Sequence, residues 1–381
     1  MRTANIIDYS GSMPDPREDN RRHKLIEILF IVICAAVCGA EKWADIEAFG
    51  KAKESWLRKY LELPHGIPSH DTFARVFAKL DPQALNERFS QWVQALYEQC
   101  AGEIISIDGK TARRSHDAAN DRSALHMVSA WASKAGLTLA QRRVDEKSNE
   151  ITAIPELLEV LEFSGCVVTI DAMGTQKSIA KRIIDGEGEY VLALKGNHPT
   201  LEDEVELYFA DELTRDTERE SDKNEDSENE IDYYKSVDTG HGRVEVRECW
   251  ASGDIEWLPG KQEWKGLRSI CAVRSKRIIG ERESEEVRYF ISSLPPVADT
   301  VGRAVRAHWG IENSLHWVLD MAFREDECRK RKDNSAENFA VLRHLTLNLL
   351  KREKTCKRSI AGKRLLAGWD ERYMEKVLFG P

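Results

Sequence analysis

The chain has 381 residues, of which 41% are hydrophobic, and this is enough for a large buried core and more than one domain. Its formal net charge is −9, a balance that by itself argues against a nucleic-acid partner. The charge is uneven, however. Residues 202–232 hold fifteen acidic and three basic side chains, a local net charge of −12, which leaves +3 for the rest. A basic surface is therefore still available for an anionic partner.

The eight cysteines are scattered and form no CxxC pair, which makes a zinc ribbon a poor interpretation. The apolar run Ile28–Ala40 is shorter than the roughly 20 residues of a membrane span, so it favours a buried helix. The first ten residues, MRTANIIDYS, lack the apolar core of a signal peptide. These features predict a cytoplasmic protein without a membrane segment.

The first 100 residues predict an all-helical domain. One helix covers residues 21–39, Ser69 is a candidate N-cap for the next, and Asp81 followed by Pro82 is typical of a further helix start. The region also contains several basic residues, which either bind nucleic acid or face solvent, and the sequence leaves both interpretations open. They are Arg21, Arg22, Lys24, Arg58, Lys59, Arg75 and Lys79.

The pattern changes at Glu103, where short β-rich runs begin. Strands are expected at 104–108, 125–131, 137–144, 166–171 and 190–194, with helices at 152–163 and from residue 175. Three consecutive strands followed by helix, strand, helix and strand are typical of an RNase H-like mixed sheet with flanking helices. The sequence therefore predicts an α/β fold behind the N-terminal helical domain.

Strand-like pieces return after the acidic stretch, so residues from about 200 to 295 predict a β-rich insertion. We expect residues 211–231 to form a mobile surface loop, because they carry much like charge and few apolar side chains. The chain becomes helical again from Val301. The predicted organisation is a helical domain over 1–100, a catalytic domain over 101–350 and a basic C-terminal tail over 351–381.

Two apolar runs each lead to an aspartate, Asp108 and Asp171, followed by a small residue. In open α/β sheets the carboxyl ends of neighbouring strands share one edge, so these carboxylates are expected to lie close together. Adjacent carboxylates repel unless cations neutralise them, and Mg²⁺ suits carboxylate oxygens. Taken singly, each aspartate is better interpreted as a turn or helix cap. The matched pair favours a site with two Mg²⁺ or Mn²⁺ ions that cleaves phosphodiesters.

Such a site needs a third carboxylate, and Glu312 is the candidate, because its helical neighbours form a partly apolar stripe that packs. Its rivals are Asp320, Glu325 and Asp326. A zinc site made by His308, Glu312 and His316 is a weaker alternative, since no Cys cluster or HExxH motif supports it. Three further acids near the fold are interpreted as solvated loop charges. They are Asp145, Glu146 and Glu150.

Long stretches of the chain resemble bacterial insertion-sequence transposases of the H-repeat-associated group, within the DDE superfamily. They lie in order between about residues 15 and 350. The stretches are HKLIEILFIVICAAVCGAEKWADIEAFG, LPHGIPSHDTFARVF, SIDGKTARRS, DEKSNEITAIPELL, TIDAMGTQK, YVLALKGN, GHGRVEVR and HWGIENSLHWVLDMAFREDECR.

The resemblance implies that Asp108, Asp171 and Glu312 form the catalytic, metal-binding triad of an RNase H-like core. It implies cleavage at the inverted-repeat ends of an element, transfer of 3′-hydroxyls to target DNA, and a homodimer that joins two ends. Related enzymes carry a Tyr–Arg–Glu–Lys signature around the glutamate. Val305, His308 and Leu319 replace its Tyr, Arg and Lys here, so hairpin chemistry is left open. The alternatives are a catalytically silent DNA-binding descendant and a structure-specific nuclease.

Candidate DNA contacts are basic or aromatic side chains near the motifs, any of which could instead be an ordinary surface or packing residue. They are Lys110, Arg113, Arg114, Lys195, His198, His241, Arg243, Arg306, His308 and Trp309.

Overall fold

The computed structural model describes residues 13–17, 21–97, 102–116, 123–144, 149–214, 231–240 and 242–380. The chain forms two compact units. Unit 1 comprises Met1–Glu98, Gly109–Asn149 and Glu312–Pro381, and unit 2 comprises Gln99–Asp108 and Glu150–Ile311.

The described strands form one mixed sheet in the order β3-β2-β1-β4-β5-β9-β8-β7-β6. The first five are β1 (Ile104–Ala112), β2 (Leu125–Ala132), β3 (Leu137–Arg143), β4 (Val167–Ile170) and β5 (Glu189–Leu194). β2 and β3 are antiparallel, whereas β4 runs parallel to both β1 and β5. This order confirms the predicted RNase H-like mixed sheet. β1 is longer than expected, because it continues past Asp108 to Ala112.

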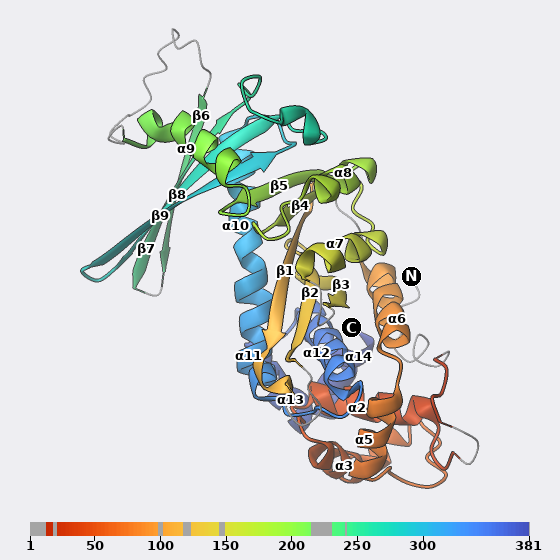
Figure 1. Cartoon of the computed structure of the whole chain (residues 1–381). Helices are drawn as coiled ribbons and strands as arrows, with labels where there is room; N and C mark the ends of the chain where they lie inside the picture. Colours follow the sequence, from red (N-terminus) through yellow and green to blue (C-terminus); the bar gives the residue numbers. More distant parts are fainter. Residues whose placement is uncertain are drawn as a thin grey trace. The chain divides into compact units, whose positions relative to one another are not determined.

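Unit 2 combines parallel strands and helices with a long antiparallel extension (Figure 1). The extension consists of β6 (Ile231–Gly240), β7 (Arg243–Ser252), β8 (Ser269–Ile279) and β9 (Arg282–Ser292). The helices are α7 (Glu150–Glu159), α8 (Lys177–Asp185), α9 (Pro199–Thr214) and α10 (Ala298–Ile311). The expected β character of the insertion is confirmed, although α9 and β6 were not predicted. Residues 211–214 belong to α9, and residues 215–230 of the expected acidic loop lie outside the described residues.

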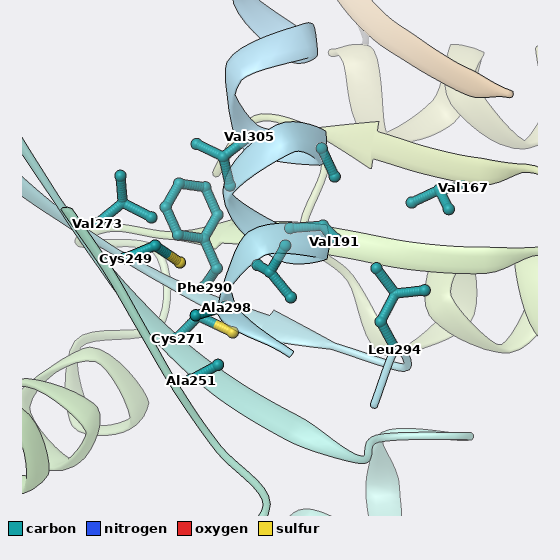
Figure 2. Close-up of a cluster of buried hydrophobic side chains, with 12 residues drawn as sticks. Val167, Val191, Cys249, Ala251, Cys271, Val273, Phe290, Leu294, Ala298 and Val305 are labelled. Atoms are coloured by element: carbon teal, nitrogen blue, oxygen red, sulfur yellow. The ribbon is translucent and has the colours of Figure 1, made fainter. Parts of the chain in front are cut away.

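The core of unit 2 lies between α10 and the sheet. Figure 2 shows Ala298 and Val305 from α10 facing Val191 of β5 and Phe290 of β9, all of them buried. Apolar side chains on one face of a helix are buried efficiently in this way, and full burial of a Val or Phe side chain contributes about 1.5–3 kcal/mol to stability. This packing fixes α10 across the strands that carry the site.

Unit 1 is mainly helical. Its helices are α2 (Leu25–Val37), α3 (Trp43–Ala52), α4 (Glu54–Leu57), α5 (His70–Lys79), α6 (Pro82–Leu96), α11 (Trp317–Phe323), α12 (Ser335–Arg352), α13 (Ile360–Trp369) and α14 (Glu371–Phe379). The N-terminal region is thus helical as predicted, and Ser69 and Asp81 occupy the expected N-cap positions. Within the described ranges, none of the helices combines the length and apolar character that a membrane span requires.

Candidate active site

Asp108 and Asp171 occupy matching positions on two neighbouring parallel strands. Ile107 of β1 pairs with Ile170 of β4, and each aspartate is the next residue in its strand direction. Both side chains are half-buried. The two carboxylates therefore lie close together, as the sequence pattern indicated, although only β4 ends there and β1 continues to Ala112.

The turn after Asp171 is held by hydrogen bonds. The backbone N–H of Gly174 donates to Oδ1 of Asp171 at 3.2 Å, and Thr175 donates its hydroxyl proton to the carbonyl oxygen of Ala193 at 2.6 Å. A Cβ atom at Gly174 would lie only 2.4 Å from Cγ2 of Ile170. Glycine at this position therefore lets the turn pack directly against β4 while its N–H orients the carboxylate.

Glu150 joins these two aspartates, although its sequence context had favoured a solvated loop charge. It is the first residue of α7. One carboxylate oxygen from each of Asp108, Glu150 and Asp171 lies within 4.8 Å of the others. Burial, followed by the charge of Glu150, raises the pKa of Asp171. Like charges this close are costly unless a cation neutralises them, so the cluster fits a hard divalent cation with oxygen ligands.

Beneath the aspartates lies a buried polar layer that connects both strands with α10. The hydroxyl of Thr169 donates to Oγ of Ser106 at 3.2 Å, and Ser106 donates to the carbonyl oxygen of Ala307 at 3.4 Å. Nδ1 of His308 lies 3.0 Å from Oγ1 of Thr169. Because Thr169 already donates to Ser106, the His308 Nδ1–H is the donor in this bond. These contacts hold the end of α10 beside the site.

Glu312 begins the chain segment that follows α10, and this segment belongs to unit 1. Residues Glu312–His316 form a π-helical turn before α11, and such turns occur frequently at functional sites. The Glu312 side chain is 53% exposed, and its Oε2 lies 3.6 Å from Nδ1 of His316.

The three rivals of Glu312 each lie beside a fixed cation of unit 1. Nζ of Lys110 lies 2.8 Å from Asp320 and 3.6 Å from Asp326. Glu325 is buried, with its Oε1 3.6 Å from Nη1 of Arg343. Carboxylates already neutralised by Lys or Arg are poorer metal ligands, so this geometry favours Glu312 over its rivals.

The candidate DNA contacts from unit 1 differ in availability. Lys110 forms ion pairs with Asp320 and Asp326, and its side chain is only 12% exposed. These contacts are typical of a lysine that stabilises the fold. The side chain of Arg113 is 82% exposed, with Asp326 at 3.3 Å. Arg114 is exposed, and its carbonyl oxygen accepts hydrogen bonds from Arg331.

The described candidates from unit 2 lie after β5, on β7 and on α10. Lys195 and His198 follow β5; Lys195 is exposed, and Nε2 of His198 lies 2.7 Å from the carbonyl oxygen of Thr175. On the extension, Arg243 of β7 lies 3.0 Å from Glu245. Arg306 of α10 lies 3.7 Å from Asp238 of β6. Trp309 stacks under the guanidinium of Arg288, 4.5 Å from the ring centre. His241 lies outside the described residues.

Two family models match the chain. Residues 7–93 match the family described as DDE_Tnp_1-associated. Residues 99–349 match the family described as Transposase DDE domain. Together they cover the N-terminal helices and all of the strands.

Similar full-length proteins occur in Escherichia coli. YncI of strain O157:H7, which is named as a candidate transposase, is 40% identical over 99% of this chain and 95% of its own length. YhhI of strain K12, named as an H repeat-associated candidate transposase, is 38% identical over 100% of this chain and 99% of its own. A cryo-EM structure of a piggyBac transposase synaptic complex with hairpin DNA matches with 11% identity and a TM-score of 0.44. The match covers 100% of this chain and 78% of that one.

Proposed function

Because the chain belongs to the DDE transposase family, we propose that it cuts DNA at the ends of an element and transfers the 3′-hydroxyls to a target. The observation that carries this proposal is the carboxylate cluster formed by Asp108 of β1, Asp171 after β4 and Glu150 of α7. The family implies DNA as a partner and the use of divalent metal.

The donor set of the cluster fits such a metal. Asp108, Glu150 and Asp171 offer carboxylate oxygens only, which Mg²⁺ and Mn²⁺ prefer over softer metals. Divalent ions bound there, two in our proposal, would activate an attacking oxygen and stabilise the leaving oxygen of a phosphodiester. The protein supplies the fixed geometry, through the strand register and the turn at Gly174.

We assign Glu312 as the third catalytic carboxylate beside Asp108 and Asp171. Two features support the assignment. His308 anchors α10 at Thr169, four residues before Glu312, and the neighbouring acids Asp320 and Asp326 are paired with Lys110. Glu150 is a further carboxylate within reach of the metal.

The wider proposal concerns domains and assembly. Residues 1–100 form the associated helical domain, 101–350 the catalytic domain with its insertion, and 351–381 a basic C-terminal segment. The protein acts as a homodimer that holds two inverted-repeat ends. Of the proposed DNA contacts, the exposed Lys195, Arg113 and Arg114 are favoured by their accessibility.

The experiment incubates the full chain with Mg²⁺, a labelled duplex carrying one terminal inverted repeat, and a supercoiled target plasmid. Nicking at the repeat and appearance of label on the plasmid are expected, and Asp108→Asn abolishes both. Nicking without joining would favour the structure-specific nuclease. Repeat binding without nicking would favour the silent DNA-binding descendant.

A further inference from the structure

A basic groove crosses the N-terminal helices of unit 1. Its volume is about 600 Å³, and among the described residues that line it five are cationic and none is Asp or Glu. The cations are Arg17, Arg21, Arg22, Arg75 and Lys79. In a chain with a formal net charge of −9, such a segregation of positive charge marks a surface for an anionic partner.

One wall of the groove is a single face of α5. Ser69, Thr72, Arg75 and Lys79 line it, and their spacing of three and four residues places them on one side of a helix. Hydroxyl and cationic side chains of this kind are the usual contacts to phosphate oxygens. At 1.5 Å per residue this face is about 15 Å long, which corresponds to roughly four phosphates along one strand of a DNA duplex.

Another part of the lining, around Arg17, is held by a half-buried ion pair. Asp15 accepts hydrogen bonds from Nε and Nη2 of Arg17 at 2.9 and 2.7 Å, and Arg17 also donates to the carbonyl oxygen of His23 at 2.7 Å. Arg17 therefore serves mainly to hold the chain between Asp15 and His23 in place. The positive charge in the groove that no carboxylate neutralises comes from other residues.

Three cations carry that unneutralised charge. Among the described residues, no carboxylate forms an ion pair with Arg22, Arg75 or Lys79, and all three side chains are exposed. Arg75 contacts only the backbone oxygen of Asp71. A guanidinium in this state can bind a phosphate through two parallel hydrogen bonds.

We propose that this groove binds the sugar–phosphate backbone of double-stranded DNA, so that the N-terminal helices grip the element end while the carboxylate cluster acts on it. The inference rests on the proposed function for the identity of that DNA. A free phosphate ion would engage only one or two of the cations. The length of the α5 face and the supply of cations from two chain segments, residues 17–22 and 75–79, fit a continuous strand instead.

The test measures binding in EDTA, so that cleavage plays no part. The affinity of the full chain for a fluorescent 40-base-pair duplex is measured by anisotropy over a range of salt concentrations. The duplex carries the inverted repeat that flanks the coding region, and a scrambled duplex is measured beside it. The test variant is Arg75→Ala with Lys79→Ala. The matched control is Arg372→Ala with Lys376→Ala, an exposed Arg–Lys pair at the same spacing on α14.

The slope of log affinity against log salt concentration should be shallower by about 1.8 in the test variant than in the wild type. Two phosphate contacts are removed, and each contributes about 0.9 to the slope. The test variant should bind both duplexes at least tenfold more weakly at low salt, whereas the control keeps the wild-type slope. An unchanged slope in the test variant, or an equal loss in the control, overturns the proposal. A labelled single strand of the repeat is measured under the same conditions, and tighter binding of it than of the duplex overturns the assignment to duplex DNA. Asp108→Asn should bind normally here, which separates this outcome from a failure of the catalytic proposal.

Discussion

Thr169 on β4 and His308 on α10 are joined by a hydrogen bond of 3.0 Å between Oγ1 and Nδ1. Thr169 is 2% exposed and precedes Asp171 by two residues, so both point to the same face of the sheet. We predict that Thr169→Val lowers the free energy of unfolding by about 1–3 kcal/mol, because buried polar partners lose their hydrogen bonds. It should also slow nicking on the order of tenfold or more, because small displacements in an active site are costly.

Thr138 provides the control for this substitution. It is a fully buried threonine on β3 whose Oγ1 has no hydrogen-bond partner in the described part of the chain. Thr138→Val should therefore be neutral or stabilising. Chemical denaturation and a nicking time course are measured for both variants. Equal effects at the two positions would show that the link between Thr169 and His308 has no special role.

Glu150 is expected to contribute to metal binding. We predict that Glu150→Gln weakens Mn²⁺ binding by roughly tenfold or more, because a unit charge at about 5 Å contributes on the order of 3 kcal/mol at an effective dielectric of 20. Electron paramagnetic resonance of free Mn²⁺ measures the affinity directly. Glu156→Gln, an exposed position on the same helix, is the control. If the two variants bind Mn²⁺ equally well, Glu150 is not a ligand.

The identity of the metal gives a further prediction. Mg²⁺ or Mn²⁺ should support nicking, whereas Ca²⁺ should support DNA binding only, because its larger and looser coordination misplaces the reacting oxygens. Asp171→Asn should nick in none of the three. Equal nicking rates in Ca²⁺ and Mg²⁺ would be incompatible with the proposed metal chemistry.

A buried histidine predicts acid sensitivity. Burial lowers the pKa of His344 to about 3 from its ordinary value of 6.5, and its Nδ1 lacks a hydrogen-bond partner among the described residues. As the pH falls through 6.5 the unfolded chain takes up a proton that the folded chain does not, so stability falls between pH 6.5 and 3. Between pH 7 and 5 this loss is about 2 kcal/mol. His344→Leu should abolish this loss of stability. Urea denaturation of both proteins at pH 7 and at pH 5 measures it. If the stability of His344→Leu depended on pH as that of the wild type does, His344 would not be the cause of the acid sensitivity.

The features that sequence could predict were those with a local signature. Apolar runs that end in Asp108 and Asp171 indicated parallel strands, and strand register then brought the carboxylates together. Glu150 was misinterpreted because nothing local distinguishes a solvated acid from one that the start of α7 carries toward a sheet edge. The π-helical turn at Glu312 and the strand β6 were likewise missed. A π-turn depends on packing rather than on a motif, and β6 follows directly on the acidic stretch that obscured its pattern.

The assignment of Glu312 is tested most directly by nicking of a duplex that carries one element end, with Glu312→Gln and Asp326→Asn measured side by side. The amide at 312 keeps the side-chain shape but removes the charge that binds metal, so this variant should bind the end and fail to nick it. Asp326 neutralises Lys110 and Arg113, and its amide variant should keep most of the activity. Normal nicking by Glu312→Gln together with loss of nicking by Asp326→Asn would contradict the proposed triad.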